Sequence, residues 1–300
     1  MSPRVPPLLV LLLSVAGISF AAPLIRLSDA HPLAIATWRL AFSLLVIALF
    51  LLPSRGWRQW RTLDGAGLAL AVAAGVMLAL HFWSWNTSVG LTTVAASVVL
   101  VNLQPVVVAA LSALWLREAP TSRQWMGIAV AMLGALVVAV PDVRAAGGAG
   151  TSGRALLGDL LALVGAVTAA LYYLAGRRVR QTLDLWPYVA LVYGACLVTL
   201  LVFAAAARVP LWPQPPRELA IFAALAIGPM MLGHTGMNWA LRYLPAYVVN
   251  LTTLGEPVGA TLLAAALPWI REVPPALTLA GGALVLAGVL VSLPRAGSAP

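Results

Sequence analysis

Long apolar stretches alternate with short polar connections along the whole chain. Most of the stretches end at arginine, tryptophan or proline, the residue types that mark membrane interfaces and helix ends. Their lengths are close to the roughly 20 apolar residues that a helix needs to cross a bilayer. They comprise residues 7–25, 32–52, 66–86, 92–116, 125–140, 156–174, 186–207, 219–239, 245–270 and 275–293. The pattern predicts an all-α membrane protein with ten transmembrane helices.

The composition supports this fold class and excludes a water-soluble globular protein. Of the 300 residues, 62% are hydrophobic and only 9% are charged, and the mean hydropathy is +0.96. Soluble domains contain about 25% charged residues. We therefore expect the lipid bilayer to be the main surrounding of the chain, with no large soluble domain left over.

The charged residues exclude several function classes. All 18 basic residues are arginine, so a P-loop lysine, a Schiff-base lysine and a lysine general base are absent. The arginines are scattered among the connections rather than clustered, so the net charge of +9 indicates membrane topology and not a nucleic-acid partner. The three histidines are far apart and Cys196 is the single cysteine, so we expect no metal site and no cofactor.

The arginines also predict the orientation of the chain. If the N-terminus is cytoplasmic, eleven arginines lie on cytoplasmic connections and six on the opposite side, which favours two cytoplasmic termini. The first stretch could instead be a cleaved signal peptide, because Arg4 precedes it and small residues occur at 19–21. Cleavage would leave nine stretches and disrupt the repeat described next.

The chain divides into two similar halves. Residues 145–153 (AAGGAGTSG) have the composition of a flexible linker, between a first unit, 1–144, and a second unit, 154–300. A shift of 152 residues aligns Gln104-Pro105 with Glu256-Pro257, and a shift of 154 aligns Arg117-Glu118 with Arg271-Glu272. Five helices per half is an odd number, so the second repeat should be inverted relative to the first, as in many secondary transporters.

These residues resemble the drug/metabolite transporter superfamily, in its ten-helix branch built from two EamA domains. Residues 161–180 are similar to that family's first helix with its trailing arginines, and the counterpart at 17–26 is weaker. Both halves carry the family's proline in the fourth helix, followed by a glutamate and spaced glycines; these are Pro105, Glu118, Gly127 and Gly134, then Pro257, Glu272, Gly281 and Gly288. Arg117 and Arg271 depart from the family, which commonly has glycine there.

The resemblance covers nearly the whole chain and is specific for the fold more than for the substrate. The tryptophan-rich third helix resembles most the aromatic amino-acid exporters of the YddG kind. The resemblance implies a bacterial inner-membrane exporter of amino acids, notably aromatic ones, and no enzymatic activity.

Arg39, Glu256 and His81 are candidate functional residues within the predicted spans because they carry charge or can titrate. Arg39 lies about eight residues into the second stretch, where an arginine is costly and needs a partner. It could face a water-filled cavity, pair with Glu256, or extend to the outer headgroups. Glu256 could line the same cavity or carry a proton, or be a polar residue at a proline kink. His81, near the outer end of the third stretch, could line a site beside Trp85.

These residues suggest how an amino acid could be held between the two halves. We expect Arg39 or Gln104 to meet its carboxylate and Glu256 or Asn102 to meet its ammonium group. Trp85 and Tyr172 are the candidates for contact with its side chain. We expect His234 at the other membrane face, where it would make a hydrogen bond between helices.

The predicted function is the export of amino acids, aromatic and other neutral ones, by alternating access. A transporter for lipophilic cations or nucleotide sugars would share the architecture. An intramembrane enzyme would need a nucleophile or metal constellation that these residues do not offer. No nucleotide-binding motif is present, so ATP does not drive transport within this polypeptide; proton coupling through Glu256 or His81 and facilitated diffusion are both compatible with the sequence.

Overall fold

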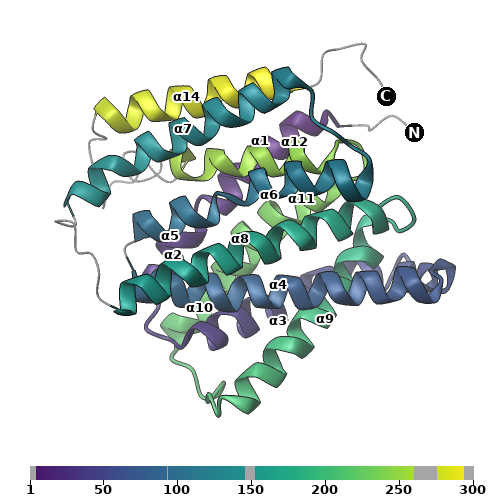
Figure 1. The fold of residues 1–300 in the computed structure, drawn as a ribbon. Helices are drawn as coiled ribbons and strands as arrows, with labels where there is room; N and C mark the ends of the chain where they lie inside the picture. Colours follow the sequence, from purple (N-terminus) through teal and green to yellow (C-terminus); the bar gives the residue numbers. More distant parts are fainter. Residues whose placement is uncertain (1–4, 93, 146–152, 260–275, 294–300) are drawn as a thin grey trace.

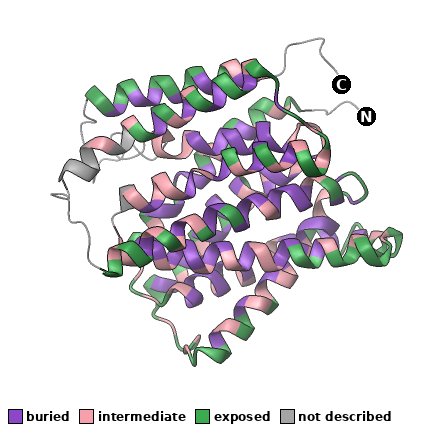
Figure 2. Ribbon diagram, viewed as in Figure 1, coloured by how far each residue is buried: buried purple, intermediate pink, exposed green. Residues whose placement is uncertain are grey.

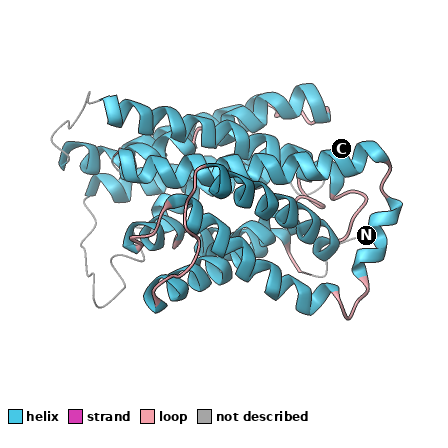
Figure 3. Cartoon of the chain, turned by 90° about the horizontal axis from the view of Figure 1, so that it is seen from below, coloured by secondary structure: helices cyan, strands magenta, loops and turns pink. Residues whose placement is uncertain are grey.

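The computed structural model describes residues 5–92, 94–145, 153–259 and 276–293. These residues form helices joined by short turns, without a strand (Figures 1 and 3). The elements are α1 (Pro7–Ile18), α2 (Ala21–Leu27), α3 (Pro32–Leu51), η1 (Gly56–Thr62), α4 (Gly65–Leu91), α5 (Val94–Val101), α6 (Gln104–Leu111), η2 (Ser112–Leu116), α7 (Ser122–Ala145), α8 (Gly153–Val179), α9 (Leu185–Ala206), α10 (Pro216–Leu225), η3 (Ala226–His234), α11 (Thr235–Ala240), α12 (Ala246–Leu251), η4 (Thr252–Gly255) and α14 (Ala276–Ser292).

The prediction of an all-helical membrane protein is confirmed. Seven helical segments of the described residues are long and apolar enough to cross a bilayer, and two shorter apolar helices lie within α7 and α14. Each predicted stretch coincides at least in part with described helix. The ninth stretch is described only as far as residue 259, and Arg271-Glu272 and most of the linker lie outside the described residues. The count of ten crossings therefore stays a prediction.

Several predicted stretches are broken helices. The fourth stretch is interrupted at residues 102–103, between α5 and α6, and ends in the π-helical η2. The eighth contains the π-helical η3, with Pro229 inside it, and the ninth changes from α12 to the 3₁₀ turn η4. Proline lacks the N–H that the helix would use, and π turns are frequent at functional sites. The apolar pattern alone predicts continuous helices, so these breaks are a result of the structure.

The buried residues lie in the centre of the bundle, and the outer faces of the helices are exposed (Figure 2). Many exposed side chains are large and apolar, such as Leu12, Leu49 and Leu290 at 67%, 71% and 67% exposure. Such a surface would be unfavourable in water but is expected where helices contact lipid. The interior therefore contains the polar groups, and the exterior matches a bilayer.

Helices α7 and α14 pack side by side at the edge of the bundle (Figure 1). A Cβ atom on Gly127 would lie 2.6 Å from the carbonyl oxygen of Gly288, and one on Gly134 would lie 2.7 Å from that of Gly281. Only glycine allows two helix backbones to approach so closely. The spaced glycines of these two helices therefore serve helix packing.

Candidate functional site

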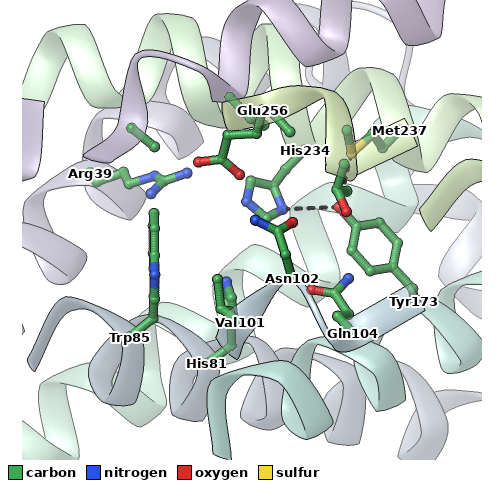
Figure 4. Close-up of a pocket in the computed structure, with 13 residues that line it drawn as sticks. Arg39, His81, Trp85, Val101, Asn102, Gln104, Tyr173, His234, Met237 and Glu256 are labelled. Atoms are coloured by element: carbon green, nitrogen blue, oxygen red, sulfur yellow. Dashed lines mark hydrogen bonds between the residues drawn. The ribbon is translucent and has the colours of Figure 1, made fainter. Parts of the chain in front are cut away.

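A cavity in the centre of the bundle is lined by residues from both halves of the chain (Figure 4). Six of the seven predicted substrate-binding residues line it. The lining residues are Ile18, Ala21, Arg39, His81, Trp85, Val101, Asn102, Gln104, Tyr173, His234, Met237, Thr253 and Glu256. Residues far apart in the sequence therefore meet at one place.

Two helix breaks bring polar side chains into this cavity. Asn102 lies in the turn between α5 and α6, and Gln104 begins α6. In the second half, Thr253 lies in η4 and Glu256 follows that turn directly. Discontinuous helices of this kind place backbone and side-chain polar groups at the substrate sites of secondary transporters. The aligned Gln104 and Glu256 thus occupy corresponding breaks in the two halves.

Arg39, on α3, is buried with 1% exposure, so it does not extend to the headgroups. Its guanidinium carbon lies 4.4 Å from the ring centroid of Phe82. Its Nε and Nη1 atoms are buried without a hydrogen-bond partner among the described residues. No ion pair joins it to Glu256 in the described part of the chain, although the two groups face one another across the cavity (Figure 4).

Three further polar groups around the cavity lack partners within the described ranges. They are the Oε1 atom of Glu256, the indole Nε1 of Trp85 and the amide Nε2 of Gln104. A buried polar atom without a hydrogen bond costs about 1–3 kcal/mol. Such atoms in one cavity indicate a site for a ligand that supplies complementary donors and acceptors.

The two histidines of the lining each use one ring nitrogen. Nδ1 of His81 lies 2.9 Å from the carbonyl oxygen of Gly165. A carbonyl only accepts, so Nδ1 donates and the other nitrogen of a neutral ring is an acceptor. The His81 ring stacks on Trp85 with centroids 6.0 Å apart, and Nδ1 of His234 lies 3.4 Å from the Tyr173 hydroxyl.

The sequence placed His81 and His234 at opposite membrane faces, and this was wrong. Both line the same cavity, and their ring centroids are 6.3 Å apart. The physical reason is that α4 continues through Leu91, so His81 lies well inside the helix rather than near its end. The predicted hydrogen bond of His234 to another helix is present, to Tyr173.

Tyr172 does not line the cavity, and its neighbour Tyr173 does. Tyr172 is fully buried and accepts a hydrogen bond from the side chain of Asn238. One residue along an α-helix turns the side chain by about 100°, which moves Tyr172 to another face.

Tyr173, His234, Met237 and Thr253 are lining residues that the sequence did not place in the site. The Tyr173 hydroxyl donates to the sulfur of Met237 at 3.1 Å. Among the described residues, no cluster of three or more histidine, cysteine, aspartate or glutamate side chains could hold a metal ion.

Polar contacts join the two halves at one end of the bundle. Arg177 forms an ion pair with Glu118 at 2.7 Å, and Gln59 donates to the Asp184 carboxylate at 2.7 Å. Asp184 also pairs with Arg242 at 2.6 Å. The hydrogen bond from Gln59 and the interaction with Arg242 hold the pKa of the Asp184 carboxyl below its usual value.

The other end of the bundle has its own polar contacts. Arg217 pairs with Asp29 at 2.8 Å, and the Ser28 hydroxyl donates to Glu218. The indole of Trp38 donates to the carbonyl of Leu211 at 2.8 Å. The cavity thus lies between the contacts at the two ends of the bundle. For access to the cavity to alternate between the two membrane sides, the contacts at one end must open while those at the other end close.

Comparison with known proteins gives a consistent result. The model of the EamA-like transporter family matches residues 6–140 and 156–293. The chain is similar to an uncharacterized transporter of Bacillus subtilis, YdfC, with 25% identity over 83% of this chain and 78% of the relative. It is also 29% identical to a probable terminal-alkyne amino-acid exporter of Streptantibioticus cattleyicolor, over 94% of this chain and 91% of the relative.

A third relative is an uncharacterized transporter of Archaeoglobus fulgidus, with 26% identity over 92% of this chain and 93% of the relative. A solved crystal structure superimposes with a TM-score of 0.77, at 20% sequence identity and covering 95% of each chain. At this identity the likeness shows the fold alone. The family match covers each half of the chain separately, which agrees with a duplicated sequence.

Proposed function

Because the chain belongs to the EamA-like transporter family, we propose that it exports neutral amino acids, aromatic ones among them, by alternating access. The family and the relatives are transporters, so the chain is a transporter and not an enzyme. The single observation that carries the proposal is a central cavity in which unpaired donors and an unpaired acceptor face each other.

This arrangement matches the two charges of a free amino acid. Arg39 and Trp85 offer unpaired N–H groups to a carboxylate, and the Oε1 atom of Glu256 offers an acceptor to an ammonium group. Charge-assisted hydrogen bonds of this kind are about twice as strong as neutral ones. The guanidinium would repel a ligand that is only cationic, which favours a zwitterion over a lipophilic cation. The similarity to a probable amino-acid exporter supports the same class.

Alternating access is supported by contacts that occur twice. With the 154-residue shift, the contact of Gly127 with Gly288 corresponds to the contact of Gly281 with Gly134. A two-fold axis between inverted repeats produces this exchange of partners. We infer from it that the halves form inverted five-helix repeats around the cavity.

A second pair of contacts supports the same symmetry. Arg177 donates from Nη1 to the carbonyl of Leu241 at 2.6 Å, and Arg26 donates from Nη1 to the carbonyl of Val89 at 3.2 Å. The acceptors Leu241 and Val89 are 152 residues apart, the shift that aligns the polar residues of the helix breaks, and the donors Arg177 and Arg26 are 151 residues apart. A rocking motion between two states related by the pseudo-two-fold axis needs similar contacts in each half.

We place both termini in the cytoplasm and the protein in a bacterial inner membrane. The first turn of α1 and the last turn of α14 lie at the same end of the bundle (Figure 1), as an even number of crossings requires. The arginine excess on the corresponding connections points that end to the cytoplasm.

The experiment that tests the proposed function is substrate competition in proteoliposomes. Purified protein is reconstituted into vesicles that contain unlabelled phenylalanine, and the uptake of labelled phenylalanine is followed. Neutral amino acids should compete, whereas a lipophilic cation and a nucleotide sugar should not. Competition by the cation or the nucleotide sugar, without competition by amino acids, would contradict the proposal.

A further inference from the structure

The cavity has two chemically different ends (Figure 4). Arg39 and Trp85 lie at one end, and Gln104 and Tyr173 lie at the other. Glu256 lies above this first end in the view of Figure 4, with its carboxylate toward Arg39. A ligand held by Arg39 and Glu256 would therefore extend its remaining part toward Gln104.

Gln104 has a fixed position and an unused amide nitrogen. It begins α6, and the following Pro105 occupies the first turn of that helix. The side chain is buried, with 6% exposure, and Nε2 has no hydrogen-bond partner in the described part of the chain. It is therefore an amide that lines the cavity and lacks a partner for its donor.

The polar neighbours of Gln104 are already engaged. The Tyr173 hydroxyl donates to Met237 and lies 3.4 Å from Nδ1 of His234. The amide of Asn102 donates to the carbonyl of Val98 in the preceding helix α5, at 2.8 Å. Gln104 thus offers a free N–H donor at this end of the cavity.

From this we infer that the Gln104 end recognises the tip of the substrate side chain, and that it selects neutral tips that accept a hydrogen bond from the Gln104 amide nitrogen. Hydroxyl and carboxamide oxygens accept such a hydrogen bond. Tyrosine and glutamine meet this requirement, whereas phenylalanine and leucine leave the amide unpaired. This inference rests on the proposed function and specifies the substrate class of the same site.

The charges of the cavity argue against an ionised tip. The charged lining residues are Arg39 and Glu256, and the proposed function uses both for the carboxylate and ammonium groups. The described lining residues around Gln104 are Tyr173, Met237 and Asn102, none of which offers a counter-charge. A neutral polar tip is therefore the best match.

Sites that hydrogen-bond a substrate group discriminate strongly against analogues that lack it, because the group of the protein is left unpaired. We expect tyrosine to compete at about tenfold lower concentration than phenylalanine, the ratio that corresponds to about 1.4 kcal/mol. Glutamine should outcompete leucine in the same way. The comparison of tyrosine with phenylalanine is the sharper one, since the two differ by a single hydroxyl.

The test is counterflow of labelled phenylalanine in proteoliposomes, with tyrosine, phenylalanine, glutamine and leucine as competitors. It uses the wild type, Gln104→Leu, and Gln181→Leu as a matched control, since Gln181 is exposed at the end of α8. We expect the tyrosine preference in the wild type and in the control, and its loss in Gln104→Leu.

Two results would overturn the inference and leave the proposed function in place. In one, tyrosine and phenylalanine compete equally in the wild type, a comparison that needs no variant. In the other, Gln104→Leu transports and keeps the preference. No exchange of any amino acid by folded, inserted protein would instead overturn the proposed function and the inference with it.

Discussion

Replacement of Arg39 by methionine separates a substrate-binding role from a structural one. The guanidinium is buried, has two nitrogen atoms without partners, and forms no ion pair among the described residues. Its one defined favourable contact is with the face of Phe82. Methionine retains an unbranched apolar stem and removes the charge, so the substitution removes this contact and the unpaired donors together.

The expected change in stability is small. Loss of the cation–π contact costs about 0.5–2 kcal/mol, and loss of two unpaired buried donors recovers about 1–3 kcal/mol for each atom. These two free-energy terms have opposite signs, so the unfolding temperature of Arg39→Met should lie within a few degrees of the wild-type value or above it. A structural ion pair would behave otherwise, since removal of one buried partner costs about 3–5 kcal/mol.

The expected change in substrate affinity is large. Removal of one partner of a buried charge pair costs about 2–5 kcal/mol, which corresponds to a roughly 30-fold to several-thousand-fold loss of affinity. Phenylalaninamide carries the ammonium group without the carboxylate, so its weak binding should not fall when the guanidinium that repels it is removed. Counterflow with phenylalanine and with phenylalaninamide measures both effects, and thermal unfolding of the purified protein measures stability.

Two outcomes would refute this reasoning. One is an equal loss of phenylalanine and phenylalaninamide transport, because then Arg39 does not recognise the carboxylate. The other is a large fall in the unfolding temperature, which would show that Arg39 supports the fold through contacts other than those described.

Three further predictions follow from the packing, the end contacts and the topology. Gly288→Leu should destabilise the α7–α14 contact by at least about 1–3 kcal/mol. Gly194→Leu is the control, because the space around its Cβ position is open, and it should unfold at the wild-type temperature. Equal unfolding temperatures of the two variants would contradict the close packing. Asp184→Asn should lower the unfolding temperature at pH 7. The difference in unfolding temperature between wild type and variant should shrink as the pH falls below the usual pKa of 3.8, because a carboxyl group with a lowered pKa stabilises the fold only while it is charged. A difference that does not depend on pH would contradict this. In cells, a membrane-impermeant maleimide should label Gln214→Cys directly and Thr62→Cys only after permeabilisation. The native Cys196 is buried and should give little background labelling. The reverse labelling pattern would contradict the predicted orientation.

The sequence predicted the fold class because lipid imposes a simple rule on it. A segment that crosses a bilayer must be helical and apolar over about 20 residues, and this rule is readable without tertiary contacts. The same rule does not predict where helices break. The π turns of η3 and the interruption before Gln104 arise from prolines and from packing between helices, which the apolar pattern does not contain.

The candidate site was predictable in part for a related reason. Polar side chains within apolar stretches are costly, so Arg39 and Glu256 stood out, and the structure places both at the cavity. Tyr173 and Met237 did not stand out, because aromatic and thioether side chains are common in helices that face lipid or a core. Only the rotation of α8 distinguishes Tyr173 from Tyr172, and one sequence does not fix that rotation.

Equilibrium binding of labelled phenylalanine to the purified protein tests the central claim most directly. It compares the wild type with Glu256→Gln, which lines the cavity, and with Glu118→Gln, which removes the same charge at the end of the bundle. The account predicts saturable binding to the wild type, similar binding to Glu118→Gln, and at least about 30-fold weaker binding to Glu256→Gln with an unchanged unfolding temperature. Equal affinity of the wild type and Glu256→Gln would contradict the claim that this cavity binds the amino acid.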